Sequence, residues 1–183
     1  MKHEKRKYLI QFLLKLSLIC SGILVALLMT AWLLGIHYNN TPSVPTGFYQ
    51  RISASITKGS YVEICPPNRE PFLTAHRYGY IKVGSCPNQM RFLLKKVAAM
   101  PGDTISITEK GLTINGKYYP NSVPLSEDLY YHSFDHFFIK DYQLKENEVL
   151  LMGENPASYD ARYFGLLPLS DVISVMKPVW IFY

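Results

Sequence analysis

The chain has little charge, and the charge that it has is unevenly placed. Charged residues make up 18% of its 183 residues and apolar residues 48%, which is typical of a chain with one membrane segment. The net charge of +5 has a strong local source, because the first fifteen residues include Lys2, Lys5, Arg6, Lys7 and Lys15. No basic stripe interleaved with aromatic residues follows, so we expect no nucleic-acid partner.

Cysteine is also scarce, and no residue pattern for a metal site is present. Cys20, Cys65 and Cys86 are the only cysteines, and none lies near a matching pair of histidines. His132 and His136 are four residues apart, but their neighbours give neither a metal pattern nor a catalytic triad. We therefore expect no metal and no other cofactor.

A long uncharged run near the N-terminus is the clearest physical signal. Residues 16–36 are rich in Leu, Ile, Val and Ala, and a helix of this length rises roughly 30 Å, the thickness of a bilayer core. The run contains no Ala-x-Ala cleavage site of a secretory signal peptide. Its uninterrupted length argues against a helix buried in a globular core, so we expect a retained transmembrane anchor.

This anchor divides the chain into three parts with different surroundings. The positive-inside rule keeps the basic tail, residues 1–15, in the cytoplasm. Residues 37–183 then lie outside, which in a bacterium means the periplasm. We expect a single-pass protein of the bacterial inner membrane with one exported domain.

The exported part contains two cysteines in an oxidising compartment, which predicts one disulfide, Cys65–Cys86. The closed loop has about twenty residues and is worth roughly 3 kcal/mol in the chain-entropy model. Two free buried thiols are the alternative. Cys20 lies inside the apolar run, where it acts as a small apolar side chain.

The pattern of the exported part is typical of a mainly β domain. Pro101, Gly102 and Asp103 indicate a tight turn, and Asn115–Gly116 indicates a two-residue hairpin. Beyond the anchor there is no helical periodicity longer than two turns. The expected strands are 60–64, 78–83, 92–100, 104–108, 112–114, 117–119, 148–152 and 179–183.

Three segments contain residues that are ordinary when each segment is taken alone: 40–49, 92–103 and 153–165. Ser43, between two prolines, reads as a loop serine. Lys95 reads as a solvated lysine, and the third segment reads as a polar turn.

Together the three segments resemble the type I signal peptidase superfamily of serine proteases, and within it the conjugative-transfer (TraF) family. They are similar to a Ser-x-Pro motif after a membrane anchor, a Lys-Lys/Arg-x-x-x-x-Pro-Gly-Asp strand, and a Gly-Asp-Asn…Ser-x-Asp-Ser-Arg-Tyr-x-Gly box. Cys65–Pro66 and Cys86–Pro87 resemble a paired Cys-Pro of the conjugative branch. The resemblance implies a coiled β-sheet catalytic domain preceded by one transmembrane helix.

The resemblance also implies a role for each matching position. Ser43 matches the nucleophile and Lys95 its general base. The hydroxyl of Thr41 and the N–H of Ser43 match the oxyanion donors. Ser158 matches the serine that orients the lysine. Asp160 and Arg162 match a charged pair that supports the site. Two positions depart from the family pattern, Glu154 where Asp is usual and Ala161 where Ser is usual.

The chemistry explains why a serine and a lysine belong together. A serine hydroxyl is a poor nucleophile unless a base removes its proton. Lysine can be that base only when it is neutral, and burial lowers its pKa. Strand alternation does not decide between Lys95 and Lys96, because apolar residues flank both. The register before Pro-Gly-Asp selects Lys95.

The implied function is a membrane-anchored endopeptidase that processes a pilin precursor for a conjugative, type IV secretion-like system. Its partners are then the precursor, components of the transfer system and the inner membrane. Whether the product is cyclised or hydrolysed stays open. Two alternatives remain: a general type I signal peptidase that removes N-terminal leaders, and a non-catalytic, membrane-anchored assembly factor.

Overall fold

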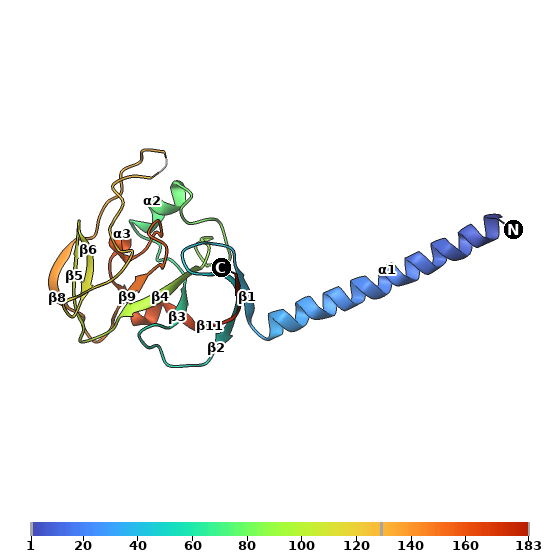
Figure 1. Cartoon of the computed structure of the whole chain (residues 1–183), viewed down its shortest axis with the longest axis horizontal. Helices are drawn as coiled ribbons and strands as arrows, with labels where there is room; N and C mark the ends of the chain where they lie inside the picture. The colour runs from blue at the N-terminus through green and yellow to red at the C-terminus, as the bar shows by residue number, and fades with distance from the viewer. Residues whose placement is uncertain (1, 129, 183) are drawn as a thin grey trace. The chain divides into compact units, whose positions relative to one another are not determined.

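The chain forms two units, Met1–His37 and Tyr38–Tyr183. The computed structural model describes residues 2–128 and 130–182. Figure 1 shows the long helix α1 in the first unit, and strands with two short helices in the second.

Helix α1 (Lys2–Leu33) begins well before the predicted anchor, and it ends at Leu33 instead of Ile36. Its part Glu4–Leu33 is long and apolar enough to cross a membrane. The helix ends because Gly35 adopts φ +65°, a left-handed conformation that is common just after helix C-termini. Strand β1 then starts at Ile36. The sidedness of the helix stays a prediction.

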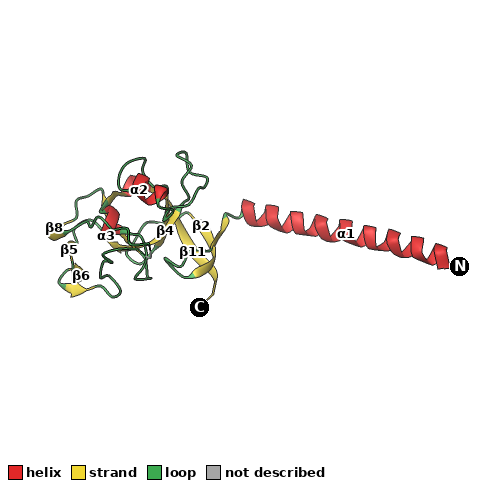
Figure 2. Cartoon of the chain, turned by 90° about the horizontal axis from the view of Figure 1, so that it is seen from above, coloured by secondary structure: helices red, strands yellow, loops and turns green. Residues whose placement is uncertain are grey.

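The second unit, together with the strand β1 that leads into it, is mainly β as predicted (Figure 2). The larger sheet has the order β1-β2-β11-β3-β4-β9-β10, and the smaller sheet has the order β7-β6-β5-β8. The larger sheet consists of β1 (Ile36–Asn39), β2 (Thr46–Ile52), β3 (Tyr61–Ile64), β4 (Leu93–Ala99), β9 (Glu148–Met152), β10 (Leu167–Pro168) and β11 (Val172–Phe182). The smaller sheet consists of β5 (Thr104–Thr108), β6 (Gly111–Ile114), β7 (Lys117–Tyr118) and β8 (Ile139–Gln143).

Two short helices pack beside the sheets, α2 (Phe72–Arg77) and α3 (Ala161–Phe164), and a 3₁₀ turn covers Leu169–Asp171. Phe72 of α2 stacks on Phe164 of α3, with ring centroids 5.0 Å apart. Both rings belong to the apolar core, so the two helices are held to it and to each other.

One apolar core joins the two sheets. Val62 of β3, Val97 of β4 and Leu151 of β9 contribute to it from the larger sheet. Ile105 and Ile107 contribute from β5, and both are buried as their alternation predicts. Strand β4 pairs antiparallel with β3 on one side and β9 on the other, so its side chains lie in the middle of the larger sheet.

Both predicted turns form as their residue types require. At the end of β4, Gly102 has φ +88°, and the N–H of Asp103 donates to the carbonyl of Met100 over 3.0 Å. Asn115 and Gly116 have φ values of +51° and +76° and join β6 to β7. These turns set where β4 ends and where β6 folds back.

Residues 78–83 do not form the predicted strand. The chain turns back on α2 there, because the N–H groups of Tyr80 and Ile81 both donate to the carbonyl of Ala75. Val83 forms a single antiparallel bridge, with Met90. Of the residues that favoured a strand, Ile81 is buried in the apolar core and Tyr80 packs against it, whereas Tyr78 and Val83 are exposed.

The C-terminal strand is longer than the predicted 179–183. β11 starts at Val172, and its pairing with β2 shifts register between Pro178 and Trp180. Proline is typical of strand edges and bulges, so Pro178 concealed the continuity of this strand. Strands β2 and β8 were not predicted, because polar residues and glycine interrupt their patterns.

Cys65 and Cys86 form the predicted disulfide. Cys65 directly follows β3, and Cys86 lies in the segment that leads into β4. The bond therefore ties the approach to β4 to the neighbouring strand. Cys20 is a free, exposed cysteine of α1.

Candidate active site

Strand β4 directs two adjacent lysines to opposite faces of the larger sheet. The side chain of Lys95 is buried, with an exposed fraction of 2%. Its Nζ lies 3.0 Å from the Oγ of Ser43 and 2.7 Å from the Oγ of Ser158. Lys96 instead donates to the carboxylate of Glu154 over 2.7 Å. The residue predicted as the base therefore lies within hydrogen-bond distance of both the predicted nucleophile and the predicted orienting serine.

Burial gives Lys95 a low pKa. Removal of water from the amine disfavours its charged form and lowers the pKa from 10.5 to about 8. The Asp160 carboxylate raises this pKa while the Arg162 guanidinium lowers it, so the two charges partly offset each other. About a tenth of Lys95 is then neutral at pH 7, against fewer than one in a thousand for an ordinary lysine.

Ser43 lies in the short loop between β1 and β2, and Asn39 holds this loop in shape. The buried Asn39 side chain donates through Nδ2 to the carbonyls of Thr41 at 2.9 Å and Pro45 at 3.2 Å. Its Oδ1 accepts from the N–H of Thr41 at 3.1 Å. Sequence reasoning missed Asn39. Its spacing of two residues before Thr41 fits an Asx turn and was the available signal.

The two predicted oxyanion donors are in different states. The hydroxyl of Thr41 donates to Oδ1 of Asn39 over 2.7 Å, so in this conformation it cannot donate to a substrate oxygen. Within the part of the chain that the structure describes, no group accepts a hydrogen bond from the N–H of Ser43. The role predicted for Thr41 therefore requires its hydroxyl to turn away from Asn39.

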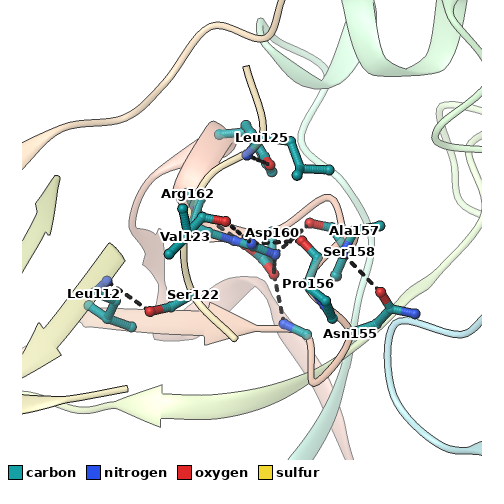
Figure 3. A network of polar contacts seen from close by, with 12 residues as sticks. Leu112, Ser122, Val123, Leu125, Asn155, Pro156, Ala157, Ser158, Asp160 and Arg162 are labelled. Atoms are coloured by element: carbon teal, nitrogen blue, oxygen red, sulfur yellow. Dashed lines mark hydrogen bonds and ion pairs between the residues drawn. The ribbon is translucent and has the colours of Figure 1, made fainter. Parts of the chain in front are cut away.

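Asp160 and Arg162 form a buried ion pair behind Ser158 (Figure 3). Nε and Nη2 of Arg162 each donate to a different carboxylate oxygen over 2.8 Å. Arg162 also donates at 2.8 to 3.0 Å to three carbonyls, those of Ser158, Pro156 and Val123. All five N–H groups of the guanidinium thus have an acceptor, and the pair fixes the segment that carries Ser158.

At Gly153 the loop of Ser43 packs against Ser158. A Cβ at this position would overlap the Ser158 side chain and would lie 2.9 Å from the carbonyl oxygen of Ser43. The N–H of Gly153 donates to Asp160 over 2.9 Å, and the N–H of Glu154 donates to the carbonyl of Ser43 over 2.6 Å. Only glycine fits this contact. Sequence reasoning gave it no role, although it heads the third segment.

The two departures from the family pattern lie in different surroundings. Glu154 accepts hydrogen bonds from Lys96 and from the hydroxyl of Tyr61, so its longer side chain bridges two residues. Burial alone would raise the pKa of Glu154, but these two hydrogen bonds and the positive charge of Lys96 together keep the pKa below its usual value. Ala161 starts α3 and is fully buried in the apolar core, where a serine hydroxyl would need a buried partner.

A cleft of about 250 Å³ opens onto Ser43 and Lys95. We call it the Ser43 cleft, and the residues that line it are 41–43, 80–82, 91–95, 134, 155 and 157–159. Much of its wall is apolar or aromatic, with Leu93, Phe134 and Tyr159 as examples. A peptide bound there would lie directly beside the serine and the lysine.

The chain matches one family and several curated relatives. A family model described as signal peptidase, peptidase S26, matches residues 7–181. Two plasmid transfer proteins TraF from Escherichia coli are 36% and 34% identical to this chain, over 92% and 90% of it and 96% of each relative. A conjugal transfer protein TraF from Agrobacterium tumefaciens (strain 15955) is 31% identical, over 81% of this chain and 84% of its own length.

Among solved structures, a signal peptidase I from Enterococcus faecalis V583 is similar, with a TM-score of 0.36 and 19% identity. The match covers 67% of this chain and 97% of that one. The family match nearly spans the whole sequence, and the relatives align over most of their lengths. The chain therefore belongs to the signal peptidase family, peptidase S26, and within it to the TraF group of conjugal transfer proteins.

Proposed function

We propose that this protein is a membrane-anchored serine endopeptidase in which Ser43 is the nucleophile and Lys95 is its general base. One observation carries the proposal: a buried lysine amine with a lowered pKa lies 3.0 Å from a serine hydroxyl at the wall of a cleft. A base whose pKa lies near the working pH transfers protons most efficiently. An ordinary exposed lysine could not serve, because it is charged at that pH.

In the proposed reaction, neutral Lys95 takes the proton of the Ser43 hydroxyl while Oγ attacks the carbonyl carbon of the scissile bond. The C–N bond of the tetrahedral intermediate then breaks, and the leaving amine takes that proton from Lys95. The acyl part of the substrate remains as an ester of Ser43. Attack by water releases a linear product, whereas attack by an amine of the same substrate releases a ring.

The negative oxygen of the intermediate needs fixed donors, each typically worth a few kcal/mol. The free N–H of Ser43 supplies one donor. The Thr41 hydroxyl supplies the second after it turns from Asn39 to the substrate oxygen. Because Asn39 still holds the N–H of Thr41, the loop keeps its shape during this exchange.

Ser158, Asp160 and Arg162 act on the base and not on the substrate. The Ser158 hydroxyl accepts from Lys95 over 2.7 Å and so directs the amine toward Ser43. The carbonyl of Ser158 accepts from Arg162 over 2.9 Å, which fixes the position of that serine. Arg162 also neutralises Asp160, so the carboxylate does not fully restore the charge of Lys95.

The proposed substrate is a pilin precursor, and the proposed partners are other components of a conjugative transfer system. Two relatives are named plasmid transfer proteins, which supports this setting. Helix α1 would anchor the protein in the bacterial inner membrane, with the basic tail in the cytoplasm and residues 37–183 in the periplasm. The catalytic domain would then meet precursors as they emerge from the membrane.

The test is the mass of the pilin in cells that carry wild type, Ser43→Ala or Ser55→Ala. Ser55 is exposed and lies outside the Ser43 cleft, so it is a matched control. We expect unprocessed precursor with Ser43→Ala and normal mature pilin with the control. A cyclic product would be lighter than the linear one by one water. Normal processing with Ser43→Ala would contradict the proposal.

A further inference from the structure

We propose that Lys82 and Arg91 form a subsite of the Ser43 cleft that binds a carboxylate of the substrate. The inference rests on the proposed function, because it concerns the peptide that the same cleft would hold. It adds a charge preference, which is a property that the pair Ser43 and Lys95 does not determine.

Both cations lie on the wall of the cleft that contains Ser43 and Lys95. None of the described residues that line this cleft is acidic. Lys95 is buried and bonded to Ser43 and Ser158, so its charge is less accessible to a ligand than the charges of Lys82 and Arg91. The positive potential of the cleft therefore comes mainly from Lys82 and Arg91, and it favours an anionic ligand.

Several other cations of the second unit have an acidic partner, with N···O distances of 2.7 to 2.8 Å: Arg51 with Glu63, Lys58 with Asp103, and Lys96 with Glu154. Lys82 and Arg91 differ from these three cations. Across the described ranges 2–128 and 130–182, neither side chain has a hydrogen-bond or ion-pair partner. Both charges are thus available to a ligand.

The backbone that carries the two cations is held firmly. The N–H of Arg91 donates to the carbonyl of Lys82 over 2.8 Å, and the N–H of Gly84 donates to the carbonyl of Gln89 over 2.8 Å. In the turn that the second of these hydrogen bonds closes, Cys86 forms the disulfide to Cys65, which directly follows β3. The disulfide therefore braces a hairpin that presents one lysine and one arginine side by side.

The geometry suits a carboxylate. An arginine guanidinium can bind both oxygens of a carboxylate at once, and a neighbouring ammonium adds a flexible point charge. In a peptide substrate this group is either an acidic side chain near the cleavage site or the free C-terminus of a short leaving segment. Both sources present the same chemistry to the two cations.

The test measures binding of four peptides to the full chain with Ser43→Ala in neutral detergent micelles. The peptides have two sequences, Ala-Ser-Ala-Ala-Ala-Glu and Ala-Ser-Ala-Ala-Ala-Gln. Each sequence is made once with a C-terminal carboxylate and once with a C-terminal amide, and all four peptides have a neutral fluorophore at the N-terminus. We expect the uncharged Gln amide to bind about three- to tenfold more weakly than a charged peptide, and high salt to reduce the difference. The charged peptide that binds more tightly than the uncharged Gln amide shows whether the bound carboxylate is the Glu side chain or the C-terminus.

Two further variants test whether Lys82 and Arg91 cause the preference for charged peptides. Lys82→Gln with Arg91→Gln, added to Ser43→Ala, should bind all four peptides equally. Lys117→Gln removes an exposed charge on β7 away from the cleft and should keep the preference. The inference is overturned if Ser43→Ala alone binds all four peptides equally, or binds none of them measurably. It is also overturned if the charge preference persists after Lys82→Gln and Arg91→Gln.

Failure of the proposed function gives a different result. With Ser43 intact, the protein should cleave the uncharged Gln amide, and Lys117→Gln should leave that rate within about twofold. If no peptide is cleaved but the charge preference persists, the peptidase proposal fails and the subsite stands. If the Gln amide is cleaved without any charge preference in binding, the subsite fails and the peptidase proposal stands.

Discussion

Lys95 and Lys96 are neighbours on β4, yet the two faces of that strand give them opposite properties. On one face, Lys95 is buried between two serine hydroxyls, and its pKa is lowered to about 8. On the other face, Lys96 is about one-third exposed and forms an ion pair with Glu154 at 2.7 Å. The contrast shows that the lysine's surroundings, and not its residue type or strand, decide whether it can act as a base.

The difference arises from what each face contacts. The face of Lys95 meets Ser43 and Ser158, neither of which carries a charge, and the nearby Asp160 is already paired with Arg162. The face of Lys96 meets a carboxylate directly. Burial without a paired carboxylate disfavours the charged form of an amine. Substitutions on the two faces should therefore have unequal effects.

Removal of each lysine in turn should give the largest contrast. Lys95→Met should lower the rate of precursor processing by about 10³-fold or more, because the serine loses its base. Lys96→Met should stay within about threefold of wild type, because it loses only a partly exposed ion pair. The rates are measured by mass spectrometry of membranes that contain the precursor. An equal loss in both variants would remove the distinction between the two faces.

The same two substitutions should change stability in opposite directions, by smaller amounts. The pKa of Lys95 is about 8 in the folded chain and near 10.5 in the unfolded one, so at pH 7 the buried ammonium costs up to roughly 3 kcal/mol. Lys95→Met should then raise the free energy of unfolding at pH 7 by on the order of 1–3 kcal/mol. Lys96→Met should lower it by less than about 1 kcal/mol.

The pH dependence gives this prediction its sign. Between about pH 8 and 10.5 the unfolded chain binds more protons at Lys95 than the folded chain, so wild-type stability rises with pH across that window. The advantage of Lys95→Met should therefore shrink as pH rises. The difference in the free energy of unfolding between Lys95→Met and wild type is measured by urea unfolding of the full chain in detergent, with tryptophan fluorescence as the signal. A constant advantage from pH 7 to 10 would show that packing, and not charge, causes it.

Local sequence signals predicted the parts of the fold that depend on neighbouring residues. The turn at Gly102 and the hairpin at Asn115–Gly116 need left-handed backbone conformations, which these residue types allow. Strands β5 and β9 match the predicted ranges 104–108 and 148–152. β11 could not be read in full, because a long pairing with β2 and β3 outweighs the local effect of Pro178.

The residues of the candidate site also divide into those that were predicted from the sequence and those that were missed. Ser43 and Lys95 were selected by motif resemblance, since alternation treats Lys95 and Lys96 alike. Asn39 was missed although its hydrogen bonds are local and its spacing to Thr41 fits an Asx turn. Gly153 was missed because its role depends on where distant segments meet. The contact of Gly153 with Ser43 and Ser158 exists only once the chain is folded.

The most direct test of the central claim is the pH dependence of wild-type cleavage under single-turnover conditions from pH 6 to 10. If neutral Lys95 is the base for Ser43, a pKa of about 8 predicts a rate that rises about tenfold between pH 7 and pH 9 and then levels off. The Lys96→Met variant should show the same midpoint. A wild-type rate that is flat or falls across this range would contradict the assignment of Lys95 as the base.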